Sequence, residues 1–212
     1  MTEYSMQAKL ITEFIGTFFL TLTICTAAAF GTAGSYAPFA IASTLMVMIY
    51  AGGHVSGAHY NPAVTISIYI RGACDKSEVA PYIASQVVAG VMGAMVASNV
   101  LMPDGEVGPL VMDTGPAFGA ELMFTFALAY VILNVATSES TDGNGYYGAA
   151  IAFVVLAGAL TVGPISGASF NPAVTASLVS AGVMGAADTW VHLVPQLIGG
   201  VLAALVFNAQ RE

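Results

Sequence analysis

The sequence predicts an all-α membrane protein with six transmembrane helices and two re-entrant half-helices arranged as an inverted repeat. The 212-residue chain is 57% hydrophobic and only 8% charged, whereas soluble domains carry about 25% charged residues. Between Glu13 and Asp75 the only charged residue is Arg71, and one membrane-spanning helix needs about 20 apolar residues. The stretch SGAHYNPAVT at 56–65 also returns as SGASFNPAVT at 166–175.

The six predicted spans are long apolar segments separated by turn-forming residues. Gly34-Ser35, Pro103-Asp104-Gly105 and the polar segment 138–144 provide the clearest breaks, because such clusters favour turns and loops. The predicted spans cover residues 8–31, 36–55, 79–102, 116–137, 146–165 and 188–208.

Two further segments, 61–70 and 171–180, are apolar but too short to cross a bilayer, so we expect them to be re-entrant helices. Each begins with Asn-Pro. Asparagine is a good helix N-cap, and proline suits the first helical turn. Each copy of the motif therefore predicts the start of a half-helix.

The chain is predicted to form a single domain built from two inverted halves, about 1–103 and 114–212. Three predicted spans separate the two half-helices, and an odd number of crossings reverses the second half relative to the first. Other residues repeat at a similar offset: Glu13 with Glu121, and Gln86 with Gln196. Inverted repeats place functional sites near the membrane midplane, where the halves meet.

The basic residues predict the orientation of the chain. Lys9, Arg71, Lys76 and Arg211 are all the lysines and arginines in the sequence, and the six-span topology places all four on one face. Cytoplasmic loops are enriched in these residues, so we expect both termini to be cytoplasmic in a multi-pass protein of the cell (inner) membrane. The chain has no basic patch, so the sequence excludes nucleic acid as a partner.

Two half-helices that enter from opposite faces would meet with their N-termini at the bilayer centre. Each N-terminus carries about half a positive charge and free N–H groups, and each asparagine amide adds two donors. Such a site repels cations and lets a small neutral molecule accept hydrogen bonds. The candidate pore residues of the two motifs are Asn61, Pro62, Ala63, Asn171, Pro172 and Ala173.

The residues that precede each asparagine must run through the membrane without helical structure. Irregular backbone at this depth is tolerated where it is buried or lines a watery cavity, so its carbonyls are candidate pore acceptors. The acids Glu13 and Glu121 lie inside predicted spans, and we expect each to hold the irregular segment of its own half. The candidate carbonyl residues are Gly57, Ala58, His59, Tyr60, Gly167, Ala168 and Ser169.

The paired Asn-Pro-Ala motifs, with a glutamate in the first and fourth spans, resemble the aquaporin (major intrinsic protein) family. The resemblance covers essentially the whole chain. It implies six tilted helices, two half-helices, one pore per subunit and a homotetramer in the lipid bilayer. It also implies a passive channel for water and small neutral solutes, without enzyme activity, cofactor or metal.

One position departs from the family pattern. The second motif is usually followed by arginine in water and glycerol channels, but here Val174 follows it. The resemblance maps the family's narrow selectivity ring to Ile41, Ala159, Ala168 and Val174, where strict water channels carry an aromatic residue, a histidine, a small residue and the arginine. The all-aliphatic ring predicts a wider and less polar outer constriction, unless the loop 103–115 fills it.

Three functions remain open at this point. The first is a channel for water and small neutral solutes, and the second is a related channel for glycerol-like solutes or gas with slow water flux. The third is a secondary transporter, which also uses inverted repeats. Against it, we expect no cluster of acidic residues near the midplane that could bind a coupling ion. His59 admits either a pH-sensitive gate or simple local hydrogen bonding, because histidine titrates near neutral pH.

Overall fold

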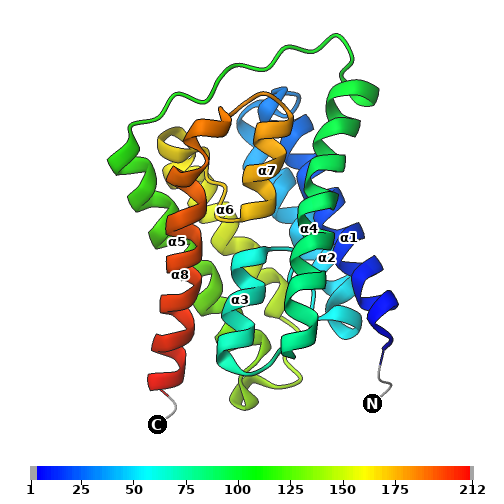
Figure 1. Cartoon of the computed structure of the whole chain (residues 1–212), viewed down its shortest axis with the longest axis vertical. Coiled ribbons are helices and arrows are strands. Elements are labelled where there is room, and N and C mark those ends of the chain that lie inside the picture. The colour runs from blue at the N-terminus through cyan, green and yellow to red at the C-terminus, as the bar shows by residue number, and fades with distance from the viewer. Residues whose placement is uncertain (1–3, 211–212) are drawn as a thin grey trace.

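The computed structural model describes residues 4–210, and all regular secondary structure among them is helical. Within these residues six helices are long and apolar enough to span a membrane, which confirms the predicted architecture. They form an upright bundle (Figure 1). Their α-helical bounds are α1 Met6–Thr23, α2 Ala37–Ser56, α4 Lys76–Val96, α5 Thr114–Ala136, α6 Tyr147–Ser166 and α8 Trp190–Ala209.

The two half-helices enter the bundle from opposite ends. Helix α3 covers Pro62–Arg71 and α7 covers Pro172–Ser180, and Figure 1 shows α3 in the lower half and α7 in the upper half. We call these ends the α3 end and the α7 end. Both half-helices begin near the centre, so their N-termini face each other. Short 3-10 turns at Gly34–Tyr36, Glu139–Thr141 and Ala186–Asp188 lie in the connections.

The first and third spans end differently from the plain helices that the sequence predicts. Helix α1 continues as a π-helix over Ile24–Ala29, and α4 continues as a π-helix over Ala97–Leu101. Cys25 and Ala97 are fully buried in one small cluster with Ala181, the residue after α7. The wider π turns thus lie where small side chains pack the α7 half-helix against its neighbours.

Small residues let the half-helices approach the long helices closely. A Cβ atom at Gly90 in α4 would lie 2.5 Å from the carbonyl oxygen of Ala173, and one at Gly200 in α8 would lie 2.8 Å from that of Ala63. Both distances are shorter than any van der Waals contact. Each half-helix therefore depends on a glycine of the opposite half to reach its position beside the centre.

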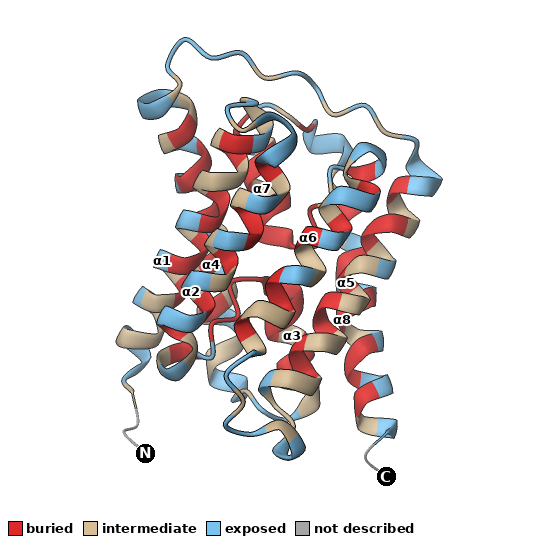
Figure 2. Ribbon diagram, turned by 180° about the vertical axis from the view of Figure 1, so that it is seen from behind, coloured by how far each residue is buried: buried red, intermediate tan, exposed pale blue. Residues whose placement is uncertain are grey.

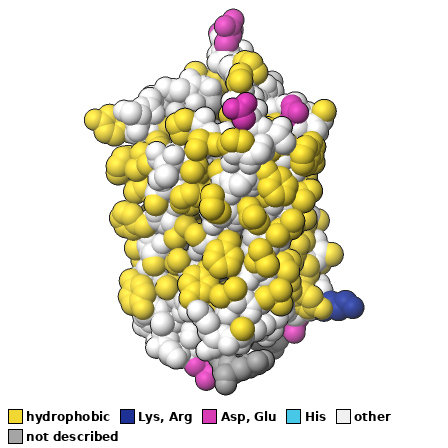
Figure 3. Space-filling model, turned by 90° about the vertical axis from the view of Figure 1, so that its left-hand side faces the viewer, with side chains coloured by type: hydrophobic (Ala, Val, Ile, Leu, Met, Phe, Trp, Pro, Cys, Tyr) yellow, Lys and Arg dark blue, Asp and Glu magenta, His cyan; other side chains and the backbone are white. Residues whose placement is uncertain are grey.

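The outer surface of the bundle suits a lipid environment. Large apolar side chains point outward along the spans, as shown by the exposed fractions of Phe19 (42%), Met95 (52%) and Phe153 (62%). Figure 3 shows a broad hydrophobic band with charged residues near its two ends. Buried residues concentrate on the inner sides of the helices and around the half-helices (Figure 2). The buried polar residues, such as Glu13 and Glu121, are thus kept inside a bundle whose exterior is apolar.

The glycine contacts predict a sharp difference between two alanine substitutions. Gly90→Ala should lower the unfolding temperature in detergent, because overpacking of this kind costs about 1–3 kcal/mol and the facing atom belongs to backbone. Gly119→Ala in α5 is the control, since a Cβ there meets nothing within 4 Å. Equal melting temperatures for the two variants would contradict this packing.

Candidate functional site

The two motif asparagines cap the half-helices at the centre of the bundle. Asn61 has extended backbone, and its Oδ1 accepts from the backbone N–H groups of Ala63 at 2.9 Å and Val64 at 3.4 Å. Asn171 accepts from the N–H of Ala173 at 2.9 Å. Each carbonyl oxygen is thereby committed to its own helix, so each NH₂ group is free to point away from it.

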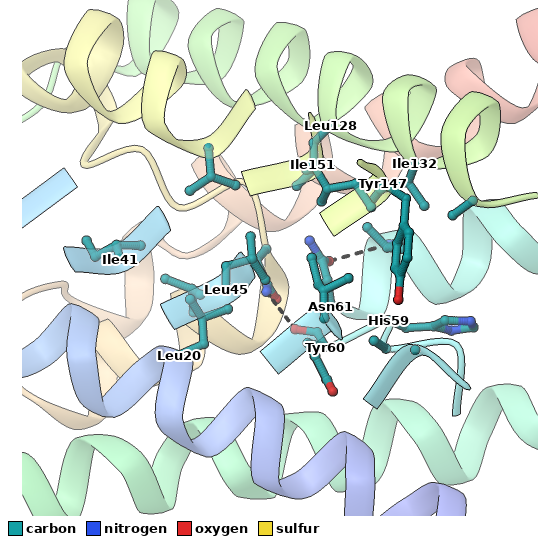
Figure 4. A pocket seen from close by; sticks show the side chains of 18 of the residues that line it. Leu20, Ile41, Leu45, His59, Tyr60, Asn61, Leu128, Ile132, Tyr147 and Ile151 are labelled. Carbon is teal, nitrogen blue, oxygen red and sulfur yellow. Dashed lines mark hydrogen bonds between the residues drawn. The ribbon is translucent and has the colours of Figure 1, made fainter. Parts of the chain in front are cut away.

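The same amides connect the two halves of the chain. Asn61 Nδ2 donates to the carbonyl of Phe170 at 2.9 Å. Asn171 Nδ2 donates to the carbonyl of Tyr60 at 2.8 Å, and Figure 4 marks this bond at Tyr60. Each Nδ2 carries two hydrogens, and in the described part of the chain only one of them has a protein acceptor. Both asparagines line the central cavity, so the second N–H of each can donate to a solute.

The segments before the asparagines share an unusual backbone. After α2, Gly57, Ala58 and Tyr60 have φ angles of 85°, 51° and 48°. After α6, the corresponding residues Gly167, Ala168 and Phe170 repeat this pattern, with φ angles of 80°, 51° and 50°. Non-glycine residues adopt this left-handed region only where the surroundings compensate for the strain.

Two buried glutamates provide that compensation. Glu13 accepts from the backbone N–H groups of His59 at 2.9 Å and Tyr60 at 2.7 Å, and from the side chains of Ser56 and Gln86. Glu121 accepts at 3.0 Å and 2.7 Å from the N–H groups of Ser169 and Phe170, and from Ser166 and Gln196. All these partners are donors, as an acceptor-only carboxylate requires.

The glutamates also set the direction of the carbonyls. The peptide bonds are trans, so a C=O points opposite to the N–H of the same peptide plane. Because the N–H groups of His59 and Tyr60 face Glu13, the carbonyls of Ala58 and His59 point away from it. The same geometry applies to the carbonyls of Ala168 and Ser169 opposite Glu121. These residues line the cavity, which gives it a row of hydrogen-bond acceptors.

Two glutamines link the buried glutamates to threonines of the repeated motif. Gln86 Nε2 bridges Glu13 and the hydroxyl of Thr65, at 2.8 Å and 3.0 Å. Gln196 bridges Glu121 and Thr175 in the same way, at 2.8 Å and 3.1 Å. His59 Nδ1 lies 3.1 Å from the Thr65 hydroxyl, which favours local hydrogen bonding for this ring. Thr65 and Thr175 belong to the repeated motif, but sequence reasoning gave them no role.

The four predicted ring residues surround the cavity toward the α7 end. Ile41 comes from α2, Ala159 from α6, Ala168 from the segment after α6 and Val174 from the first turn of α7. Their side chains contain no hydrogen-bonding atom. Polar contacts at this level therefore depend on main-chain groups alone.

A single cavity of about 850 Å³ connects these features. Ile24, Ala28 and Pro38 line it toward the α7 end, and Thr137 and Asp142 line it toward the α3 end. Aliphatic side chains cover much of its wall around the asparagines (Figure 4). Besides the predicted ring residue Ile41, this aliphatic wall includes five residues that sequence reasoning did not single out: Leu20, Leu45, Leu128, Ile132 and Ile151.

A membrane-spanning bundle in which a polar stripe and an aliphatic wall share one lengthwise cavity has the construction of a channel. The model of the major intrinsic protein family matches residues 1–207. The chain belongs to the major intrinsic protein family, as the paired motifs predict. Members of this family are passive channels for water and small neutral solutes rather than enzymes, and so is this protein.

Curated relatives agree with this assignment, and a solved structure shares the fold. The chain is 34% identical to aquaporin NIP1-2 of Arabidopsis thaliana, covering 96% of this chain and 74% of that protein. It is 37% identical to aquaporin NIP1-3 of Oryza sativa, covering 100% and 76%. Its fold matches the X-ray structure of the aquaglyceroporin from Plasmodium falciparum with a TM-score of 0.79, at 20% identity and 96% coverage of both chains.

The buried glutamates yield a testable expectation. Glu121→Gln keeps the size of the side chain but replaces one acceptor oxygen with an NH₂ group that faces donors. Losing a buried hydrogen bond to a charged group costs about 1.5–3 kcal/mol, so both the melting temperature and water permeability should fall. Glu106→Gln, in the exposed connecting loop, is the control. A Glu121→Gln channel with normal stability and flux would show that the carboxylate does not maintain the loop.

Proposed function

We propose that this channel conducts water together with larger neutral solutes such as glycerol and urea. The main support for this proposal is the aliphatic ring, which contains no cation and no side-chain hydrogen-bond donor. The ring consists of Ile41, Ala159, Ala168 and Val174. A solute crossing the ring exchanges hydrogen bonds with main-chain carbonyls on one side and contacts hydrocarbon elsewhere. Such a surface suits molecules that combine polar groups with CH groups, and it offers water no special advantage.

We also propose that the centre of the pore excludes ions and protons. Two helix N-termini converge there with about half a positive charge each, and the amides of Asn61 and Asn171 present donors to the cavity. A water molecule at this point can accept hydrogen bonds from both amides, so its own hydrogens point away from the centre on both sides. A proton then cannot pass along the row of water molecules in the pore. With valine at 174, cation exclusion depends on this central pair.

We also propose an orientation and an assembly for this channel. Lys9, Arg71 and Lys76 lie on elements at the α3 end, which supports a cytoplasmic α3 end with both termini inside, whereas Arg211 is outside the described residues. The corresponding hydrogen bonds of Glu13 and Glu121 support two inverted halves within one domain. The family supports a homotetramer with one pore per subunit, in the cell membrane.

The proposed role of the ring is tested by placing an arginine at position 174. Stopped-flow light scattering on proteoliposomes should show glycerol and urea flux through the wild type, and Val174→Arg should lower glycerol flux about tenfold or more relative to water, because the larger side chain narrows the ring. Val174→Leu, which adds no donor, should keep the wild-type preference. A wild type that matches empty liposomes for every solute would refute the channel proposal, and an unchanged preference in Val174→Arg would refute the mapping of the ring.

The central barrier is tested with aspartates. Aspartate still caps a helix but removes the amide donors and adds negative charge, so the double substitution Asn61→Asp and Asn171→Asp should create a monovalent cation current in planar bilayers. Asn99→Asp, at an exposed position of the π-helix that follows α4, adds a charge outside the pore lining and should conduct no ions. If the double variant conducts no ions but still conducts neutral solutes, the ion barrier lies elsewhere in the pore.

A further inference from the structure

The segment that connects the two halves passes over the α7 end of the bundle. Residues 102–113 form an extended strap between α4 and α5, and Figure 1 shows it arching across the mouth of the bundle above α7. Most of its residues are exposed, and Val111 is 85% exposed. Its neighbour Leu110 is partly buried, packs against the core and lines the central cavity. Met112 of the strap also packs against the core, but Leu110 is the strap residue that lines the cavity.

Two contacts hold Leu110 in this place. Its backbone N–H donates to the carbonyl of Val183 at 2.7 Å, and Val183 follows α7 and also lines the cavity. Its side chain lies against Gly167, where an added Cβ would come within 3.0 Å of Leu110 Cδ2. Gly167 immediately precedes the ring residue Ala168. Leu110 therefore lies beside the ring, on the side that the strap covers.

We propose that Leu110 is a fifth member of the outer constriction and sets the size limit of the pore. Ala159 and Ala168 are small and leave space in the ring, and a leucine from the strap adds bulk beside one of them. Because the added bulk is aliphatic, it narrows the entrance without offering a hydrogen bond. Leu110 would then select against wide solutes more strongly than against water.

This inference rests on the proposed function, since it assumes that neutral solutes pass the ring. Leu110→Ala should raise glycerol permeability several-fold while water permeability changes less, and Leu110→Trp should reduce both. Leu110→Met restores the bulk and should return the ratio of glycerol to water to the wild-type value. Val111→Ala removes similar atoms from the exposed neighbour and is the matched control. All variants keep the main-chain bond to Val183, and fluxes are compared in proteoliposomes with equal protein content.

The outcomes separate the two proposals. A wild type that conducts, combined with an unchanged glycerol-to-water ratio in both Leu110→Ala and Leu110→Trp, overturns the role of Leu110 and leaves the proposed function standing. An effect of Val111→Ala equal to that of Leu110→Ala also overturns it, because the strap as a whole would then be responsible. A wild type that conducts no solute overturns the proposed function and this inference together.

Discussion

Backbone polar groups in the middle of a bilayer must find partners within the protein, and this constraint determines the structure of the pore. The half-helices begin at mid-membrane, and an N–H group left without a partner at this depth costs several kcal/mol. Glu13 and Glu121 satisfy the N–H groups of the irregular segments. Asn61 and Asn171 satisfy the first N–H groups of the half-helices and a carbonyl of the opposite half.

The conducting path follows from how these bonds are distributed. All N–H groups of the irregular segments that bind a glutamate face away from the lumen, so the opposite carbonyls become available to a solute. The remaining wall is supplied by the long helices, whose inner faces are aliphatic, as at Leu45 and Ile132. A solute is thus held along one side only. This arrangement lets a moving solute replace its hydrogen bonds step by step along the row of carbonyls.

Much of this framework can be predicted from the sequence because it is written twice. The repeat predicts the half-helices, their asparagine caps and the correspondence of Glu13 in one half to Glu121 in the other. The long apolar segments predict the six spans. The crossed bonds from each asparagine to the other half have no local signal, since they join residues 109 and 111 positions apart. Leu110 was also beyond prediction, because only the path of the strap in space distinguishes it from the exposed Val111.

The residues that bond the pore backbone and the residues of the proposed ring are held in place in different ways. The residues that hold the pore backbone are bonded to one another: each glutamate binds a serine and a glutamine of its own half, and each glutamine also binds the threonine of the motif. Ile41, Val174 and Leu110 take no part in this network through their side chains. We therefore expect their replacement to change the width and polarity of the entrance while the backbone of the pore keeps its hydrogen bonds. On the proposed assignment of the ring and of Leu110, the selectivity of this channel can therefore change without rebuilding the framework, because these side chains are held by packing alone.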